Sequence, residues 1–305
     1  MKIDKLDTHI KDIRFKTPLK FGGSFFEKKQ SLFVNAEFSN GKQAQAELSF
    51  LPFLHKYSLV EIEKELNSIC SNLIFDLQEI KLSTFFFNTL QDMPNISKPA
   101  LYIIESLLLN VLNLFSDREN IKNNDLFIPY AENNLDDLIK KWKAQKTECL
   151  KVKIGHLDFK QDLSIIRKLQ KNFLLRLDAN RSLSIEKLIS FIDHIGTHNI
   201  DYWEEPLENF SDYLKIPKVV PIAYDENIQQ YLQQKELKAK ALVLKPSYFG
   251  SLSECFDLIS TRTEKITISS SFETKIGLNV LQQLALFNNH KHFSYSGLDT
   301  LKYLI

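Results

Sequence analysis

Five short apolar stretches in the second half of the chain each carry an ionisable residue in or beside them, at or near the C-terminal end. Successive stretches lie about one strand and one helix apart, so these charges recur in step with a βα repeat. In barrels and in open sheets of this class, the C-terminal strand ends share one edge, where catalytic groups and ligands gather. The residues are Lys151, Lys153, Asp178, Glu204, Asp225 and Lys245.

Three of these residues are carboxylates on successive predicted strands: Asp178, Glu204 and Asp225. Placed together without a cation, they would repel one another and their pKa values would rise. A hard divalent cation removes that repulsion, and an oxygen-only ligand set that leaves room for water and substrate suits Mg²⁺, with Mn²⁺ as a substitute. We therefore expect a magnesium site at this edge.

The remaining three residues are lysines. Lys151 and Lys153 are two positions apart in an apolar stretch, so both side chains point to the same face of a strand. A nearby dication and mutual repulsion would lower a lysine pKa from about 10.4 towards the range useful for a general base. A metal that binds a substrate carboxylate also makes the adjacent C–H more acidic. We expect an enzyme that removes this proton, with Lys245 facing the other two lysines across the site.

The elements that must hold these residues are short strands alternating with amphipathic helices, such as 163–170 and 185–195. This rhythm begins near Phe127 and predicts parallel βαβ units, which either a doubly wound sheet or a barrel would satisfy. The expected strands are 150–154, 173–177, 200–203, 219–223, 241–244 and 266–268.

The first part of the chain has a different pattern, typical of α+β structure. Apolar residues alternate over 32–38 and again over 44–50, on either side of Asn40-Gly41, which predicts a β-hairpin. Ser58 begins a capping box before a helical pattern. A second, buried helix is expected over 100–115, with Ser97 as its N-cap.

Composition excludes several classes of function. The chain has 305 residues and a formal net charge of +1, which gives no electrostatic reason to expect a nucleic-acid partner. Three widely separated cysteines favour a reducing cytoplasm over a disulfide framework. The polar N-terminus lacks a signal-peptide pattern, and the apolar stretch 100–115 is too short to span a membrane comfortably.

Other candidate residues are weaker. His194 and His198 have the spacing of a zinc pair, but Gly196 lies between them at a probable helix end, where histidines are common. Glu205 and Glu226 each stand next to a chosen carboxylate. We prefer Glu204 and Asp225 because each directly follows its strand.

Taken in order, these motifs resemble the enolase superfamily, and most closely its muconate-lactonising subgroup, which has a lysine on either side of the site. The resemblance rests on specific motifs between residues 151 and 300. Three of these motifs resemble the o-succinylbenzoate synthase family in particular. Those three are Arg176-Leu177-Asp178-Ala179-Asn180-Arg181, Ser269-Ser270-Ser271-Phe272-Glu273 and Gly297-Leu298-Asp299-Thr300.

The resemblance implies a modified (β/α)₇β barrel of the TIM type with an N-terminal α+β capping domain. The implied division is a capping domain over 1–98, the barrel over 99–290 and a C-terminal segment over 291–305 that packs near the junction. It also implies Mg²⁺ held by the three carboxylates and a small-molecule carboxylate as substrate, in a cytoplasmic monomer or homo-oligomer. Lys153 would be the base, Lys245 a cation on the opposite face, and Lys151 a support for Lys153.

Further residues are expected to contact the substrate. Ser269, Ser270 and Ser271 are candidates for binding a substrate carboxylate, with Arg176 and Asn180 beside the site. The resemblance also predicts a lid over the site, formed by the loop around Gly22 and Gly23 together with the loop 51–55.

The reaction implied is the dehydration of a cyclohexadiene carboxylate to an aromatic product in menaquinone biosynthesis. The same residues would also suit racemisation of N-succinylamino acids, epimerisation of dipeptides or cycloisomerisation of a muconate. A non-catalytic binding protein is the alternative from a different class, and retention of all the charged residues argues against it.

Overall fold

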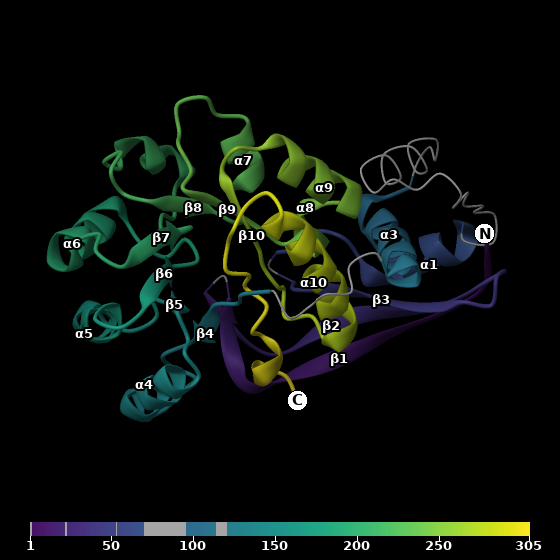
Figure 1. Cartoon of the computed structure of the whole chain (residues 1–305), viewed down its shortest axis with the longest axis horizontal. Helices are drawn as coiled ribbons and strands as arrows, with labels where there is room; N and C mark the ends of the chain where they lie inside the picture. The colour runs from purple at the N-terminus through teal and green to yellow at the C-terminus, as the bar shows by residue number, and fades with distance from the viewer. Residues whose placement is uncertain (1, 22, 53, 70–95, 114–120) are drawn as a thin grey trace.

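The computed structural model describes residues 2–21, 23–52, 54–69, 96–113 and 121–305. Two sheets organise the described chain: a three-stranded antiparallel sheet near the N-terminus and a seven-stranded parallel sheet after it. Figure 1 shows the parallel strands with helices around their outer face, and the antiparallel sheet beside them. In the described residues, no helix is both long and apolar enough to cross a membrane.

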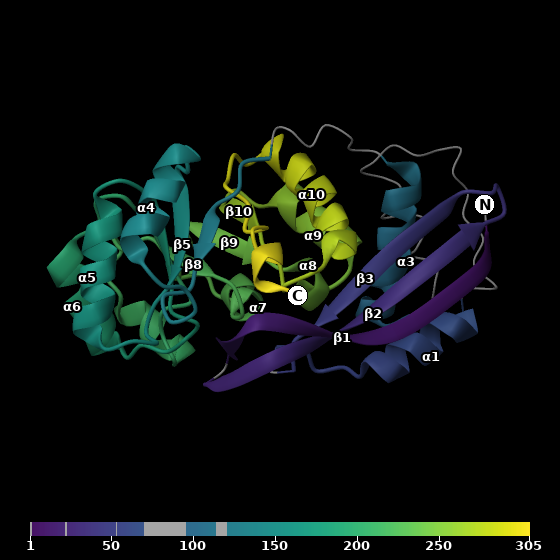
Figure 2. The same cartoon turned by 90° about the horizontal axis from the view of Figure 1, so that it is seen from below.

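The antiparallel sheet contains β1 (Ile3–Phe21), β2 (Ser24–Phe38) and β3 (Gln43–Phe50), in that order. The predicted hairpin is confirmed, because β2 and β3 pair on either side of a turn in which Gly41 has φ +77°. β1 was not predicted, since its sequence is rich in charged residues. Figure 2 shows the long β1–β2 hairpin running past the end of this sheet towards the barrel strands.

Two helices cover one face of this sheet. α1 (Leu59–Ile69) buries Leu59, Ile62 and Leu66, and α3 (Lys98–Leu112) contacts both α1 and β3. Ser97 is the N-cap of α3, as predicted, and accepts a hydrogen bond from the amide of Ala100. The predicted capping and apolar spacing therefore both appear in these helices.

The second sheet has the order β10-β9-β8-β7-β6-β5-β4, and every pairing is parallel. Helices alternate with its strands, as right-handed βαβ connections require. Its strands are β4 (Asp125–Phe127), β5 (Cys149–Lys153), β6 (Leu174–Asp178), β7 (Ile200–Glu204), β8 (Ile222–Tyr224), β9 (Ala241–Leu244) and β10 (Lys265–Ile268). The helical elements are α4 (Leu135–Ala144), α5 (Phe159–Gln170), α6 (Ile185–Ile195), η3 (Phe210–Lys215), α7 (Ile228–Leu232), α8 (Pro246–Phe249), α9 (Leu252–Thr261) and α10 (Lys275–Asn289).

One predicted strand needs correction. The stretch 219–223 was expected to be extended throughout, but β8 begins only at Ile222. Val220 donates its amide hydrogen to the carbonyl of Pro217, which makes a turn, and Val219 is 76% exposed. The apolar pattern therefore began before the strand itself.

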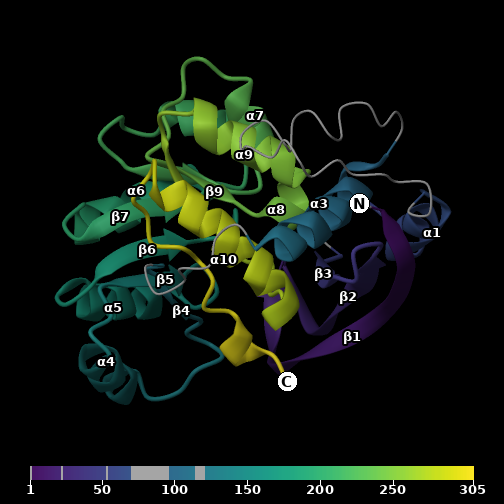
Figure 3. The same cartoon turned by 45° about the vertical axis from the view of Figure 1, so that its right-hand side comes forward.

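The two edges of the parallel sheet are joined by a segment near the C-terminus. Ser296 forms a parallel bridge with Asn123, before β4, and Gly297 forms one with Ser269, after β10. This segment therefore closes the ring of strands into a barrel, which confirms the predicted fold class. The chain then passes through η4 (Leu301–Tyr303) and ends beside β1, where Ile305 donates its amide hydrogen to Arg14. Figure 3 shows this end of the chain next to β1.

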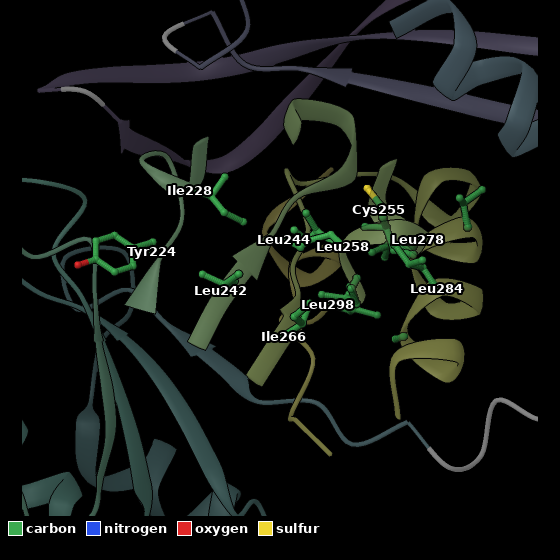
Figure 4. Packing of buried hydrophobic residues seen from close by; sticks show 14 of the residues in the cluster. Tyr224, Ile228, Leu242, Leu244, Cys255, Leu258, Ile266, Leu278, Leu284 and Leu298 are labelled. Atoms are coloured by element: carbon green, nitrogen blue, oxygen red, sulfur yellow. The ribbon is translucent and has the colours of Figure 1, made fainter. Parts of the chain in front are cut away.

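The barrel strands have two different faces. Residues on the outer face, such as Leu242 and Ile266, belong to the main hydrophobic core together with Leu258 and Leu284 of the helices, and Figure 4 labels these four side chains. The inner face is filled by small or polar groups instead, and Tyr202, Ala223, Ala241 and Val243 form a separate small cluster there. Charged residues on this inner face are therefore enclosed by protein.

Candidate active site

The strand register brings the predicted charges to one end of the barrel. Lys153 pairs in the ladder with Asp178, and Asp178 pairs with Glu204, so all three stand at the same level of adjacent strands. Asp225 directly follows β8, and Lys245 directly follows β9. Five of the six charged residues thus lie at the C-terminal ends of consecutive strands, where barrel enzymes carry their chemistry, and Lys151 lies one layer deeper on β5.

These side chains form a buried network of ion pairs. The Lys151 Nζ lies 2.8 Å from Asp178 Oδ2 and 2.5 Å from Glu204 Oε1. The Lys153 Nζ lies 2.7 Å from Asp178 Oδ2, and Lys245 pairs with Asp225 Oδ2. The carboxylates are almost completely buried. Charges are placed this way only where each has a partner.

The lysines differ in their electrostatic surroundings. Burial acts to lower the pKa of Lys151, but the carboxylates of Asp178, Glu204 and Asp225 outweigh it and raise this pKa well above its usual value. Burial also acts to lower the pKa of Lys245, but the carboxylate of Asp225 outweighs this effect and the pKa is raised. At Lys153, burial together with the positive charges of Lys151 and Lys245 outweighs Asp178, and the pKa is lowered.

The carboxylates differ in the same way. Burial would raise the pKa of Asp178, but Lys151 and Lys153 hold it well below its usual range. Burial raises the pKa of Glu204, and the charge of Asp178 adds to this. Burial likewise raises the pKa of Asp225, against the attraction of Lys245. At two of the three carboxylates, the effect of burial on the pKa therefore outweighs the attraction of the lysines.

Unsatisfied oxygens lead to the same conclusion. Glu204 Oε2 and Asp225 Oδ1 are buried and have no hydrogen-bond partner among the described residues. Over those residues, no three His, Cys, Asp or Glu side chains are already arranged around a metal position, and lysine amines lie against the carboxylates. The set consists of carboxylate oxygens, two of which have lone pairs without a partner, and such ligands fit a hard cation such as Mg²⁺.

Glu205 has a separate role from its neighbour Glu204. Its backbone has φ +39°, and its carboxylate accepts hydrogen bonds from the amide nitrogens of Asp225 and Asn227, at 2.9 and 3.1 Å. The side-chain amide of Asn227 and the hydroxyl of Tyr213 complete its partners. Burial raises the pKa of Glu205 to about 8. Glu205 therefore holds the loop that carries Asp225, while Glu204 contacts Lys151.

A small cavity lies directly above the ion pairs. It encloses about 40 Å³, which is room for little more than water. Its wall combines residues of the barrel mouth with Leu51 and Leu54, from the segment that follows β3. The other lining residues are Asn124, Leu126, Lys151, Lys153, Asn180, Glu226, Lys245, Ser269, Ser270, Ser271, Phe272, Gly297 and Thr300.

The barrel sequence decides the family. Residues 134–296, which contain all six charged residues, match the family described as "Enolase C-terminal domain-like". The chain belongs to this family. Several solved structures share its fold over nearly the whole chain. The L-Ala-D/L-Glu epimerase from Bacillus subtilis is 17% identical, with a TM-score of 0.77, over 100% of this chain and 91% of that one.

Two curated relatives with sequence similarity to this chain share a single name. The o-succinylbenzoate synthase of Haemophilus influenzae is 31% identical over 191 residues, which are 57% of this chain and 56% of that protein. The enzyme of the same name from Photorhabdus laumondii is 32% identical over 188 residues, 57% of this chain and 58% of that protein. These matches span somewhat more than half the length of the relatives. An o-succinylbenzoate synthase structure from Thermosynechococcus elongatus, complexed with Mg, is 18% identical with a TM-score of 0.72, over 96% of this chain and 92% of that one.

Some of the residues predicted to contact the substrate line the cavity, and others do not. Asn180 lines the cavity and accepts a hydrogen bond from Lys153 at 2.5 Å. Ser269, Ser270 and Ser271 also line it, but Ser270 Oγ and the Ser271 amide already donate to Glu273, each at 2.6 Å. The serine side chains that stay open to a ligand are therefore fewer than the sequence suggested.

Three predicted contacts lie away from the cavity or outside the described residues. Arg176 does not line the cavity. Its guanidinium donates to Asp201, Asn124, Ser294 and the carbonyl of Tyr295, inside the barrel. Gly23, with φ +86°, lies at the tip of the β1–β2 hairpin and does not line the cavity either. Gly22 lies outside the described residues.

The structure also adds residues that the sequence did not single out. Asn124, Leu126 and Phe272 line the cavity, and Thr300 joins them through the hydroxyl of Ser270. Thr300 carried a signal, since it ends the Gly297–Thr300 motif, but Asn124 and Leu126 precede the first regular repeat. The histidine pair behaves as expected for a helix end: His194 contacts the carbonyl of Ser190, with an N–O distance of 2.7 Å.

Proposed function

We propose that this chain is an o-succinylbenzoate synthase, which dehydrates 2-succinyl-6-hydroxy-2,4-cyclohexadiene-1-carboxylate to 2-succinylbenzoate in menaquinone biosynthesis. Curated relatives that match 57% of the chain carry this name. The physical argument for the reaction comes from the lysines.

One observation carries the proposal. The amines of Lys153 and Lys245 both line the same small cavity, although β5 and β9 are separated by three strands of the barrel. A substrate held between β5 and β9 at the barrel mouth would therefore have a lysine on each side. Removal of a carbon-bound proton needs a base on one face and stabilisation of the resulting negative charge, and this arrangement offers both.

In the proposed reaction Lys153, in its neutral form, takes the proton from the carbon beside the ring carboxylate. The electrons of that C–H bond delocalise onto the carboxylate oxygens, and the ammonium of Lys245 stabilises the charge. When those electrons form the new ring double bond, the C–OH bond breaks. Lys153 returns its proton to the departing hydroxyl, so water leaves and the ring becomes aromatic.

Asp178, Glu204 and Asp225 would hold Mg²⁺ in this proposal. When bound, the ion supplies positive charge against the substrate carboxylate and makes the adjacent C–H bond more acidic. Lys151 would keep its ammonium form between Asp178 and Glu204 and so hold the position of Lys153. Leu51 and Leu54 would exclude water over the reacting ring.

The decisive experiment follows the loss of diene absorbance. Purified protein would be mixed with the cyclohexadiene carboxylate and Mg²⁺, with and without a chelator. Rapid loss that the chelator abolishes and added Mg²⁺ restores is the expected result. No loss of absorbance from folded protein that binds Mg²⁺ would exclude the dehydration while leaving the proton-transfer chemistry open.

A second candidate uses the same two lysines. Racemisation of N-succinylamino acids or epimerisation of dipeptides needs one acid–base group on each face of the carbon, and Lys153 and Lys245 supply such a pair. Exchange of the α-proton of these substrates in heavy water would detect it. Exchange without dehydration would favour this candidate over the synthase.

A further inference from the structure

A lysine and a glutamate are buried together on the antiparallel sheet. Lys29 of β2 is 1% exposed, and Glu47 of β3 is completely buried; the Nζ and Oε1 atoms are 3.3 Å apart. Ser31 donates to the same Glu47 oxygen at 2.8 Å, and Lys29 also donates to Ser49 at 2.9 Å. Lysine is almost never buried this completely without a specific partner or task.

The second oxygen of Glu47 reaches out of the sheet to the barrel. Glu47 Oε2 accepts hydrogen bonds from the amide and hydroxyl of Thr274, at 2.8 and 2.6 Å, and from the amide of Gly277 at 3.1 Å. Thr274 is the N-cap of α10, and Figure 3 shows α10 beside β3. A helix start has unpaired amides and favours a negative charge. Glu47, from the antiparallel sheet, therefore satisfies the amides at the start of the barrel helix α10.

The start of α10 is in turn joined to the cavity. Ser49 Oγ donates to the carbonyl of Ser271 at 2.7 Å. Glu273 Oε2 accepts from the amide of Ser271 and the hydroxyl of Ser270, and Glu273 Oε1 accepts from Ser247 at 3.2 Å. Ser270 and Ser271 line the cavity. An unbroken set of short, buried contacts therefore runs from Lys29 to the cavity wall.

Packing at this junction leaves no room for adjustment. A Cβ atom on Gly277 would lie 2.6 Å from Cγ and 2.7 Å from Cβ of Glu273, and 3.0 Å from Glu47 Oε2. All three distances are at or below the closest approach that real side chains show. The two glutamates thus lie directly against the first turn of α10, at the place where a side chain on residue 277 would stand.

We propose that Glu47 is a positioning residue for the active site, and that Lys29 holds it in place. Glu47 fixes the first turn of α10 and, through Glu273 and Ser49, sets the position of the Ser270–Ser271 wall. The antiparallel sheet then acts on substrate binding through a charge that never contacts the substrate. The kinetic part of this inference rests on the proposed function; the structural part does not.

The test is Glu47→Gln, which keeps size and removes the charge. We expect the KM for the cyclohexadiene carboxylate to rise at least tenfold, kcat to stay within threefold and Mg²⁺ affinity in calorimetry to stay within twofold. Lys29→Met should change KM in the same direction. Matched controls are Glu37→Gln and Lys28→Met, because both residues are exposed on the same sheet. Unchanged KM in Glu47→Gln would overturn the proposal.

A second measurement needs no substrate. Amide hydrogen exchange over residues 269–277 should be at least tenfold faster in Glu47→Gln than in the wild type and the controls, while exchange in β5 and β6 stays unchanged. If the wild type proves inactive on the diene, this result alone decides the inference. Equal exchange over 269–277 in all variants would refute it. Gly277→Ala should accelerate the same segment, because it displaces both glutamates from the opposite side.

Discussion

The barrel mouth and the antiparallel sheet both bury charged residues, but only the mouth could be read from the sequence. At the mouth, charged residues such as Asp178 and Glu204 stand at the ends of apolar strands, so they are conspicuous in the sequence. On the sheet, Lys29 and Glu47 alternate with other residues and have the pattern of a solvent-facing edge. A charge is thus recognised by its context, and an antiparallel strand supplies a context in which polar residues are ordinary.

The two regions also differ in what their charges are expected to do. The mouth leaves carboxylate oxygens of Glu204 and Asp225 without partners, whereas every carboxylate oxygen of Glu47 has one. Unsatisfied buried groups indicate a place where a ligand binds, and satisfied ones indicate fixed structure. The predictions below test this difference, beginning with the largest effect.

The largest effect is expected at Lys153. Lys153→Ala should lower kcat on the cyclohexadiene carboxylate by about 10³-fold or more, because general acid–base catalysis typically contributes 10²–10⁴-fold and this lysine would act in both steps. The melting temperature should change little. Exposed Lys160→Ala is the matched control and should keep wild-type activity. Near wild-type turnover in Lys153→Ala would remove the mechanism.

Arg176 should matter for stability. Arg176→Met would remove hydrogen-bond donors from the carboxylate of Asp201 and from the side chain of Asn124, both inside the barrel. Asp201 would then keep only its ion pair with Lys265. Breaking a buried pair of this kind costs about 3–5 kcal/mol of unfolding free energy. Urea denaturation would measure the loss. A stability loss below about 1 kcal/mol would mean that the network is not essential for closing the barrel.

Arg176 also shows the limit of the sequence. The resemblance implied a position beside the site, and Arg176 lies two residues before Asp178 on the same face of the strand. In the structure it lies one layer deeper in the barrel, level with Lys151, where it donates hydrogen bonds to Tyr295 and Asn124. Periodicity gives the face of a strand but not the depth along it, so the sequence could not fix the distance of this arginine from the cavity.

The fold divides along the same line. The strands from β5 to β10 and the β2–β3 hairpin could be predicted from their apolar patterns, although β8 begins later than its apolar stretch. β1 could not, since its charged residues gain their order from pairing with β2 and not from a local pattern. The closing segment at Ser296 was also hidden, because only two isolated bridges join it to the edges of the sheet.

Asp225 tests the unsatisfied oxygens directly. Asp225→Asn keeps the shape of the side chain but removes the charge, so Mg²⁺ affinity in calorimetry should fall at least tenfold. Exposed Asp257→Asn is the matched control. The hydrogen bonds of Glu205 to this loop come from backbone amides and should survive, so the fold should be kept. Equal affinity in both variants would show that the ion, if it binds, is held elsewhere.

The smallest effect concerns Glu105, which lies on α3 and joins it to α9. Its carboxylate accepts hydrogen bonds from the amides of Leu252 and Ser253, at 2.5 and 3.3 Å, yet burial raises its pKa to about 8. The folded protein therefore binds a proton at this site at pH values where the unfolded chain, with an ordinary pKa near 4.5, has lost it. The unfolding free energy should fall as pH rises from about 5 to 8, by about 1.4 kcal/mol per pH unit at most.

Glu105→Gln should remove that part of the slope, and urea denaturation at pH 5, 6, 7 and 8 would measure it. Exposed Glu61→Gln on α1 is the control and should keep the wild-type slope. Glu105 resembles Glu47 in that a carboxylate from the N-terminal part of the chain completes the start of a barrel helix, but Glu47 has a buried lysine beside it. If Glu105→Gln left the slope unchanged, amide hydrogen bonds alone would suffice to keep a buried carboxylate ionised at a helix start. The lysine would then be unnecessary for charge and would be retained for the position of Glu47.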